Sequence, residues 1–215
     1  MSATILLDLD GTLSDNFPGI SRSILHALGR MGAPLPGDDV LRTCVGPPLR
    51  ESFARLIPGV DAGGVEAAID HYRERYTDVG WRENVVYDGI DGALAALHAR
   101  GVRLFVCTSK PETFAVRIVT HFGFDAYVER VYGADLAGRL DDKRALLAHL
   151  LAQERLDASQ CTMVGDRHHD VRAARANGTR AVGVLWGYGS REELAGAERI
   201  LSTPAELAGV AGYAP

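Results

Sequence analysis

The apolar and polar positions of this chain form two kinds of segment, short apolar runs and longer stretches with helical spacing. The first apolar run, Ile5-Leu6-Leu7, ends abruptly in Asp8-Leu9-Asp10-Gly11-Thr12. An apolar run that meets a turn signal predicts a buried strand followed by a tight turn. Because side chains alternate along a strand, Asp8 and Asp10 are expected on the same side of it.

Two carboxylates this close together repel each other, so they need a cation, a proton or a basic side chain between them. The alternative is that Asp8 and Asp10 only cap backbone groups in an Asx-type turn. The polar residues that the fold places beside this pair decide between the two interpretations.

Residues 15–85 show helical spacing only. Proline and glycine divide them into segments, as at Pro34, Pro36 and Pro58-Gly59, and a short segment over 38–43 follows the first break. We therefore predict a small helical module inserted directly after the first strand. The apolar positions that share a helical face are Phe17, Ile20, Ile24, Leu28 and Met31, then Leu49, Phe53, Leu56 and Ile57, and then Val65, Ile69, Tyr72, Tyr76 and Val79.

After residue 86 the pattern changes to short apolar runs that alternate with helical stretches. Strands are predicted over 102–107, 127–132, 161–164 and 180–185, and helices over 92–100, 111–122, 142–154, 167–177 and 204–210. This alternation predicts an α/β fold, a doubly wound parallel Rossmann-like sheet with helices on both faces. The expected domains are an α/β core formed by 1–14 and 86–215, and a helical cap formed by 15–85.

Composition and charge narrow the possible partners. The chain is 47% hydrophobic and 24% charged, typical of a soluble globular protein, and its formal net charge is −5. With no basic surface, a nucleic acid or an anionic membrane is not an expected partner. The three cysteines are widely spaced in or beside apolar segments and are expected to be reduced core thiols, which suits the cytoplasm. No run approaches the roughly 18 apolar residues of a membrane span.

Polar residues follow the predicted strands of the core. Asp8 and Asp10 follow the first strand, Thr108-Ser109-Lys110 the second, and Asp166 with Asp170 the fourth. Lys143 opens the helix after the third strand, and Lys110 and Lys143 are the only lysines among 23 basic residues. Ligands of such sheets bind at the carboxyl ends of the strands. Carboxylates, hydroxyls and ammonium groups gathered there are what a site for a divalent cation and a phosphate group needs.

These motifs carry a family resemblance. The segments Asp8-Leu9-Asp10-Gly11-Thr12, Thr108-Ser109-Lys110, Lys143 and Gly165-Asp166-Arg167-His168-His169-Asp170 resemble, in order and spacing, the four motifs of the haloacid dehalogenase superfamily, in its phosphatase branch. The segment 15–85 resembles the helical cap of that family. Val45-Gly46-Pro47-Pro48-Leu49, Thr108-Ser109-Lys110-Pro111 and Gly187-Tyr188-Gly189 are similar to phosphoglycolate phosphatases and to a 5'-nucleotidase-like group.

The resemblance implies a role for each motif residue. Asp8 would attack phosphorus and form an aspartyl-phosphate, while Asp10 would protonate the leaving alcohol and then deprotonate water. Mg²⁺ would be held by the side chains of Asp8 and Asp166 and by the main-chain carbonyl of Asp10. Asp170 would be a further acid near the metal. The phosphoryl group would be bound by the Thr108 hydroxyl, by Ser109 and by the ammonium group of Lys143, with Lys110 as a neighbour of the phosphate.

The resemblance implies an activity, and two alternatives to that activity stay open. The implied activity is Mg²⁺-dependent hydrolysis of a small phosphorylated metabolite, and the alternatives are a phosphomutase of the β-phosphoglucomutase type and a non-catalytic sensor of a phosphorylated ligand.

Arg50 would contact the non-phosphate end of the substrate, or is an ordinary surface arginine. His168 and His169 are expected on the rim of the site, because adjacent histidines cannot easily face one ion. A monomer or a homodimer is expected.

Overall fold

The computed structural model describes residues 3–135 and 140–212. The chain divides into two compact units, one comprising Met1–Ser14 with Val86–Pro215 and the other Asp15–Val85, here called the core unit and the helical unit. No helix in the described ranges combines the length and apolar character needed to cross a membrane.

The core unit contains one parallel sheet of six strands in the order β5-β4-β1-β6-β7-β8. The predicted α/β fold with a parallel sheet is therefore confirmed. The first strand of the chain lies in the middle, between the strands that carry the second and fourth motifs, so its carboxyl end meets theirs at one edge. The strands are β1 (Thr4–Leu7), β4 (Arg103–Pro111), β5 (Arg130–Ala134), β6 (Cys161–Gly165), β7 (Arg180–Val184) and β8 (Arg199–Leu201).

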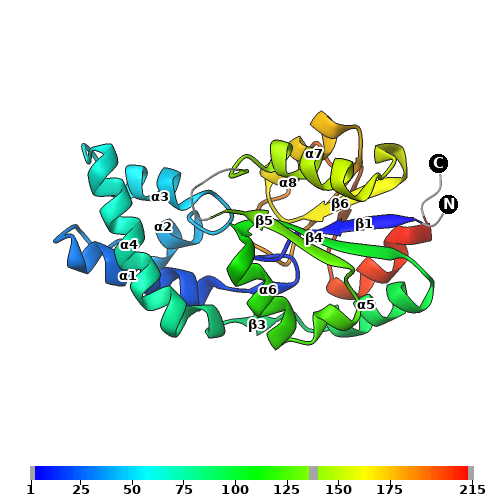
Figure 1. Cartoon of the computed structure of the whole chain (residues 1–215), viewed down its shortest axis with the longest axis horizontal. Helices are drawn as coiled ribbons and strands as arrows, with labels where there is room; N and C mark the ends of the chain where they lie inside the picture. The colour runs from blue at the N-terminus through cyan, green and yellow to red at the C-terminus, as the bar shows by residue number, and fades with distance from the viewer. Residues whose placement is uncertain (1–2, 136–139, 213–215) are drawn as a thin grey trace. The chain divides into compact units, whose positions relative to one another are not determined.

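Helices cover both faces of this sheet, α7 and α8 on one and α5 and α6 on the other (Figure 1). Under α7 and α8, the side chains of Leu6, Phe105, Leu146 and Val171 form part of a continuous buried cluster. The three cysteines are free and buried, as expected. The helices are α5 (Ile90–Ala99), α6 (Glu112–His121), α7 (Lys143–Glu154) and α8 (His168–Asn177), with 3₁₀ turns η2 (Phe124–Ala126), η3 (Ala158–Gln160) and η4 (Pro204–Gly212).

Several boundaries differ from those predicted. Strand β4 continues through the polar residues 108–110 to Pro111, with a register shift against β5 between Thr108 and Pro111. The three-residue strand β8 was not predicted, because it is too short to show alternation. The last helix, predicted over 204–210, is a 3₁₀ helix. Strand β5 begins at Arg130, later than predicted, because the N–H groups of Tyr127 and Val128 bind the Phe124 carbonyl in the turn after η2.

The helical unit contains four helices. Tyr72 and Tyr76 stack with ring centroids 5.1 Å apart, and Phe53 meets Tyr72 edge-on, so aromatic side chains fill much of its core. Short strands β2 (Ser14–Asp15) and β3 (Val85–Val86) pair where the chain passes between the units, and their length explains why the sequence shows no alternation there. The helices are α1 (Phe17–Arg30), α2 (Asp38–Arg42), α3 (Leu49–Leu56) and α4 (Ala62–Asp78), followed by the 3₁₀ turn η1 (Gly80–Arg82).

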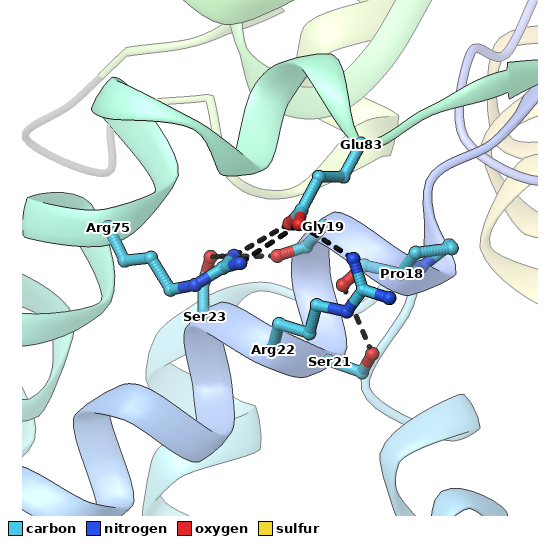
Figure 2. A network of polar contacts seen from close by, with 7 residues as sticks. All are labelled: Pro18, Gly19, Ser21, Arg22, Ser23, Arg75 and Glu83. Atoms are coloured by element: carbon cyan, nitrogen blue, oxygen red, sulfur yellow. Dashed lines mark hydrogen bonds and ion pairs between the residues drawn. The ribbon is translucent and has the colours of Figure 1, made fainter.

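The carboxylate of Glu83 joins two helices of this unit, as Figure 2 shows. It accepts hydrogen bonds from Arg75 of α4 at 2.7 and 3.0 Å and from Arg22 of α1 at 2.7 Å. Arg75 also donates to the Ser23 hydroxyl, which in turn donates to the Gly19 carbonyl at 2.7 Å. The Gly19 N–H also donates to the Glu83 carbonyl at 3.1 Å, so α1 lies very close to the chain around η1.

The close approach predicts a large difference between two glycines of α1. A Cβ on Gly19 would lie 2.0 Å from the carbonyl oxygen of Gly80, whereas a Cβ on Gly29 would have nothing within 4 Å. We expect Gly19→Ala to lower the free energy of unfolding by about 1–3 kcal/mol, as overpacking does. The control Gly29→Ala should raise it by up to about 1 kcal/mol, since alanine favours a helix. Urea melts of the two variants measure this, and equal stabilities would contradict it.

Candidate active site

The turn after β1 contains a glycine whose backbone conformation and surroundings disfavour any side chain. Gly11 has φ +81°, and a Cβ there would lie 2.3 Å from the Asp166 carboxylate. The backbone N–H groups of Leu13 and Ser14 both donate to the Leu9 carbonyl, at 2.9 and 3.1 Å, which closes the turn. The loop that carries Asp8 and Asp10 is thus held against the loop that carries Asp166.

A lysine ammonium group lies between two carboxylates at the centre of the site. Lys143 Nζ is 2.9 Å from Asp8 Oδ1 and forms a second ion pair with Asp170 Oδ1. All three side chains are buried. Burial lowers the pKa of Lys143, but Asp170 and Asp8 outweigh this and raise it above its usual value, so the ammonium group stays charged. A basic side chain was one of the groups expected between Asp8 and Asp10, and Lys143 instead lies between Asp8 and Asp170.

Three buried carboxylates are grouped closely enough to share one cation. Ligand oxygens of Asp8, Asp166 and Asp170 lie within 4.8 Å of one another. Asp166 Oδ2 accepts a hydrogen bond from the Tyr188 N–H at 2.8 Å, while its buried Oδ1 has no hydrogen-bond partner among the residues described. A buried oxygen left without a donor, beside two further carboxylates, fits a hard cation such as Mg²⁺.

The electrostatics of this cluster also favour a cation. Burial, followed by the charges of Asp8 and Asp170, raises the pKa of Asp166 well above its usual value. Burial raises the pKa of Asp170 to about 6, with Lys143 opposing the shift and Asp8 adding to it. The charged forms of Asp166 and Asp170 are therefore disfavoured, and a bound divalent cation would stabilise them.

Asp10 has a different partner from Asp8. Its Oδ2 is 2.6 Å from Lys110 Nζ, and both side chains are buried. Its carboxylate is not one of the three in the acidic cluster. Burial raises the pKa of Asp10, and Lys110 opposes the shift. Asp10 can therefore exchange a proton more readily than an exposed aspartate near neutral pH.

Thr108 and Ser109 lie in β4, beside the end of β1. The buried Thr108 hydroxyl accepts a hydrogen bond from the N–H of Lys110 at 3.2 Å. This bond is made within the segment that precedes α6, where the register shift ends the regular pairing of β4 with β5. Both residues are at the sheet edge where they were expected, and their role as phosphate ligands is a proposal taken up below.

The remaining predicted residues have other surroundings. Arg50 lies on α3 of the helical unit, where its side chain is bound to Glu66 at 2.7 and 3.2 Å. His168 Nδ1 is 2.7 Å from Glu193 Oε1, and its ring lies against that of His169 with centroids 3.9 Å apart. The two histidines are thus next to the acidic cluster but contribute no ligand atom to it among the described residues.

The contacts of the loop after β7, residues 185–193, here called the β7 loop, could not be predicted from the sequence. Its Trp186 indole N–H donates to the Thr12 carbonyl at 2.9 Å, and its Tyr188 N–H binds Asp166. A Cβ on Gly187 or Gly189 would lie within 2.6 Å of atoms of Asp166. The only signal in the sequence was the Gly-Tyr-Gly segment that contributed to the family resemblance.

Comparison with known proteins agrees with this geometry. A family model described as haloacid dehalogenase-like hydrolase matches residues 5–184. A 5'-nucleotidase from Pseudomonas aeruginosa is 45% identical over 190 residues, which cover 88% of this chain and 86% of that protein. The tyrosine-protein kinase PtkA from Mycobacterium tuberculosis is 45% identical over 185 residues, but the match spans only 62% of PtkA. Phosphoglycolate phosphatases are among the relatives at 29% to 31% identity.

A solved structure supports the same assignment. The crystal structure of a predicted phosphatase from Clostridium acetobutylicum superimposes with a TM-score of 0.92 at 36% identity, covering 97% of both chains. The family model matches most of the chain, and two of the relatives are far above 30% identity. The chain therefore belongs to the haloacid dehalogenase-like hydrolases.

Proposed function

We propose that this protein is a Mg²⁺-dependent phosphatase that hydrolyses a small phosphate monoester through an aspartyl-phosphate on Asp8. The observation that carries the proposal is the division of partners at the end of β1. Asp8 belongs to the acidic cluster and is paired with Lys143, whereas Asp10, two residues on, lies outside that cluster and is paired with Lys110. A nucleophile and a proton carrier need different surroundings of this kind.

In the first step, a carboxylate oxygen of Asp8 attacks phosphorus, and the bond from phosphorus to the ester oxygen breaks. The leaving oxygen takes the proton of Asp10, whose raised pKa favours the protonated form. Lys143 stays beside Asp8 and offsets negative charge on the transferring group. The step forms the acyl phosphate of Asp8 and releases an alcohol.

In the second step, Asp10 takes a proton from water, and the hydroxide oxygen attacks phosphorus to release inorganic phosphate and Asp8. The Thr108 hydroxyl and the Ser109 N–H are proposed to bind the phosphoryl oxygens in both steps. Asp8 and Asp166, with the Asp10 carbonyl, would hold the metal, and Asp170 would act beside them. When bound, Mg²⁺ supplies the positive charge that lets an anionic nucleophile approach an anionic substrate.

We propose as substrate a nucleoside 5'-monophosphate or a phosphoglycolate-like ester. The support is the 45% identity to a 5'-nucleotidase and the lower identity to phosphoglycolate phosphatases. Arg50 is proposed to meet the non-phosphate end of the substrate. A panel of nucleoside monophosphates, phosphoglycolate and sugar phosphates tests this, and the preferred class should exceed the others in kcat/KM by at least about 10-fold.

The decisive test of the activity is phosphate release from p-nitrophenyl phosphate by the purified protein with MgCl2, and its loss with EDTA. A phosphomutase would convert a sugar phosphate into its isomer instead of releasing phosphate. A sensor would bind a phosphorylated ligand in calorimetry without turning it over. Either result would replace the proposal.

The Asp10–Lys110 pair predicts a shift in the pH profile. Because Lys110 opposes the rise in the Asp10 pKa, Lys110→Met should raise that pKa further. Asp10 acts first as an acid, so activity is retained below its pKa and lost as the pH rises through it. The basic limb of the kcat/KM profile should therefore move to higher pH in Lys110→Met and stay in place in Lys110→Arg. An unmoved limb in the methionine variant would contradict the pairing.

A further inference from the structure

The β7 loop contacts both the side chain and the backbone of Asp166, a proposed metal ligand. Tyr188 N–H binds Asp166 Oδ2, which leaves Asp166 Oδ1 as the oxygen without a hydrogen-bond partner among the described residues. A Cβ on Gly189 would lie 1.9 Å from the Asp166 carbonyl oxygen, so the two backbones are in direct contact. The orientation of the Asp166 carboxylate therefore depends on where this loop lies.

Glu193, at the end of the β7 loop, fastens it to the start of α8. Its Oε1 accepts a hydrogen bond from Arg167 Nε at 2.8 Å and one from the His168 N–H at 3.1 Å. The same oxygen is 2.7 Å from His168 Nδ1. Partial burial raises the pKa of Glu193, but the hydrogen bonds from Arg167 and His168 outweigh this and lower it to about 2. Glu193 is therefore charged throughout the neutral range.

The residues that Glu193 holds lie between the two acids of the fourth motif. The Arg167 N–H donates to Asp170 Oδ2 at 3.0 Å, so Asp170 caps the helix with one oxygen while its other oxygen pairs with Lys143. The next backbone N–H, that of His168, donates to Glu193. The backbone from Asp166 to Asp170 is thus fixed by Asp170 on one side and by Glu193 on the other.

We propose that Glu193 is a positioning residue that sets the Asp166 and Asp170 carboxylates in the geometry that binds the cation. This inference rests on the proposed function, because it concerns the metal site of the same reaction. Residues that orient metal ligands without touching the metal typically change metal affinity 10- to 100-fold when they are removed. A role limited to holding the loop on the core would instead lower stability and leave metal affinity unchanged.

The test compares Glu193→Ala, Glu193→Gln and the neighbouring control Glu192→Ala. Glu192 is exposed and is not one of the three acids of the cluster, so its replacement should not alter the site. The first measurement is the melting temperature as a function of MgCl2 without substrate, which yields an apparent Kd for Mg²⁺. The second is the MgCl2 concentration that half-saturates release of phosphate from p-nitrophenyl phosphate at 25 °C.

We expect Glu193→Ala to weaken apparent Mg²⁺ binding by about 10-fold or more in both measurements. Glu193→Gln keeps an acceptor oxygen for Arg167 and His168, so it should recover much of the affinity. If Glu193→Ala leaves the Mg²⁺ dependence unchanged, the inference about Glu193 is wrong, whatever the melting temperature of the metal-free protein. The proposed function would still stand in that case. If the wild type shows neither a Mg²⁺-dependent melting temperature nor phosphate release, the proposed function fails as well.

Discussion

Replacing Asp8 by Asn is expected to reduce phosphate release from p-nitrophenyl phosphate by at least about 10⁴-fold while the protein remains folded. Loss of the attacking group removes the covalent route altogether, and residual rates then come only from binding and charge stabilisation. The fold should tolerate the change because an amide replaces a carboxylate of the same shape. Lys143 also keeps its second partner, Asp170.

The measurement needs a control for the loss of any aspartate from the core unit. Asp157→Asn serves, because Asp157 is exposed and caps η3, a position where asparagine performs equally well. Kinetics and melting temperature are compared among the wild type and both variants. Retained turnover in Asp8→Asn, at more than a few per cent of wild type, would exclude Asp8 as the nucleophile.

The sequence was sufficient to predict the fold class and the edge at which the motif residues gather. That success has a simple physical origin. Parallel strands separated by helices point their carboxyl ends the same way, so residues that directly follow different strands lie together. Asp8, Lys143 and Asp170 are far apart in the sequence, and the topology alone brings them to one ion-paired group.

The sequence does not indicate which side-chain atoms of the site pair with one another. In the structure the Lys110 ammonium group pairs with Asp10, a partner that the sequence does not indicate, while its place beside the phosphate stays a prediction. Lys110 lies within the register shift of β4 against β5, between Thr108 and Pro111, and no residue pattern indicates such a shift. Glu193 was missed for a similar reason, because its position relative to Arg167 follows from the path of the β7 loop.

The site balances the charges of several aspartates with those of two lysines. The chain has only two lysines, and both are buried against aspartates of the site. The four site acids, Asp8, Asp10, Asp166 and Asp170, are therefore opposed by two ammonium groups. Lysine presents a compact point charge whereas arginine presents a planar fork of donors, so the two lysines supply the site with a different kind of cation from the arginines of the rest of the chain.

Removal of the central ammonium group should therefore affect both activity and stability. We expect Lys143→Met to lower kcat/KM by about 10³-fold, because charge on Asp8 and on the transferring group is no longer offset. It should also lower the free energy of unfolding of the metal-free protein by about 3–5 kcal/mol at pH 7.5, as expected when a buried ion pair loses one partner. Arg144→Met is the matched control, because Arg144 pairs with Asp142 at the surface.

The stability loss should depend on pH with a defined sign. Burial already raises the pKa of Asp170 to about 6, above the value of about 3.9 in the unfolded chain, so Asp170 contributes less stability as the pH rises through this window. Without Lys143 the pKa of Asp170 rises further, and the window extends to higher pH. In EDTA, the deficit of Lys143→Met relative to wild type should therefore be larger at pH 7.5 than at pH 5.5. Urea melts at the two pH values measure it, and an equal deficit at both would mean that Lys143 does not hold the charge of Asp170 in the folded protein.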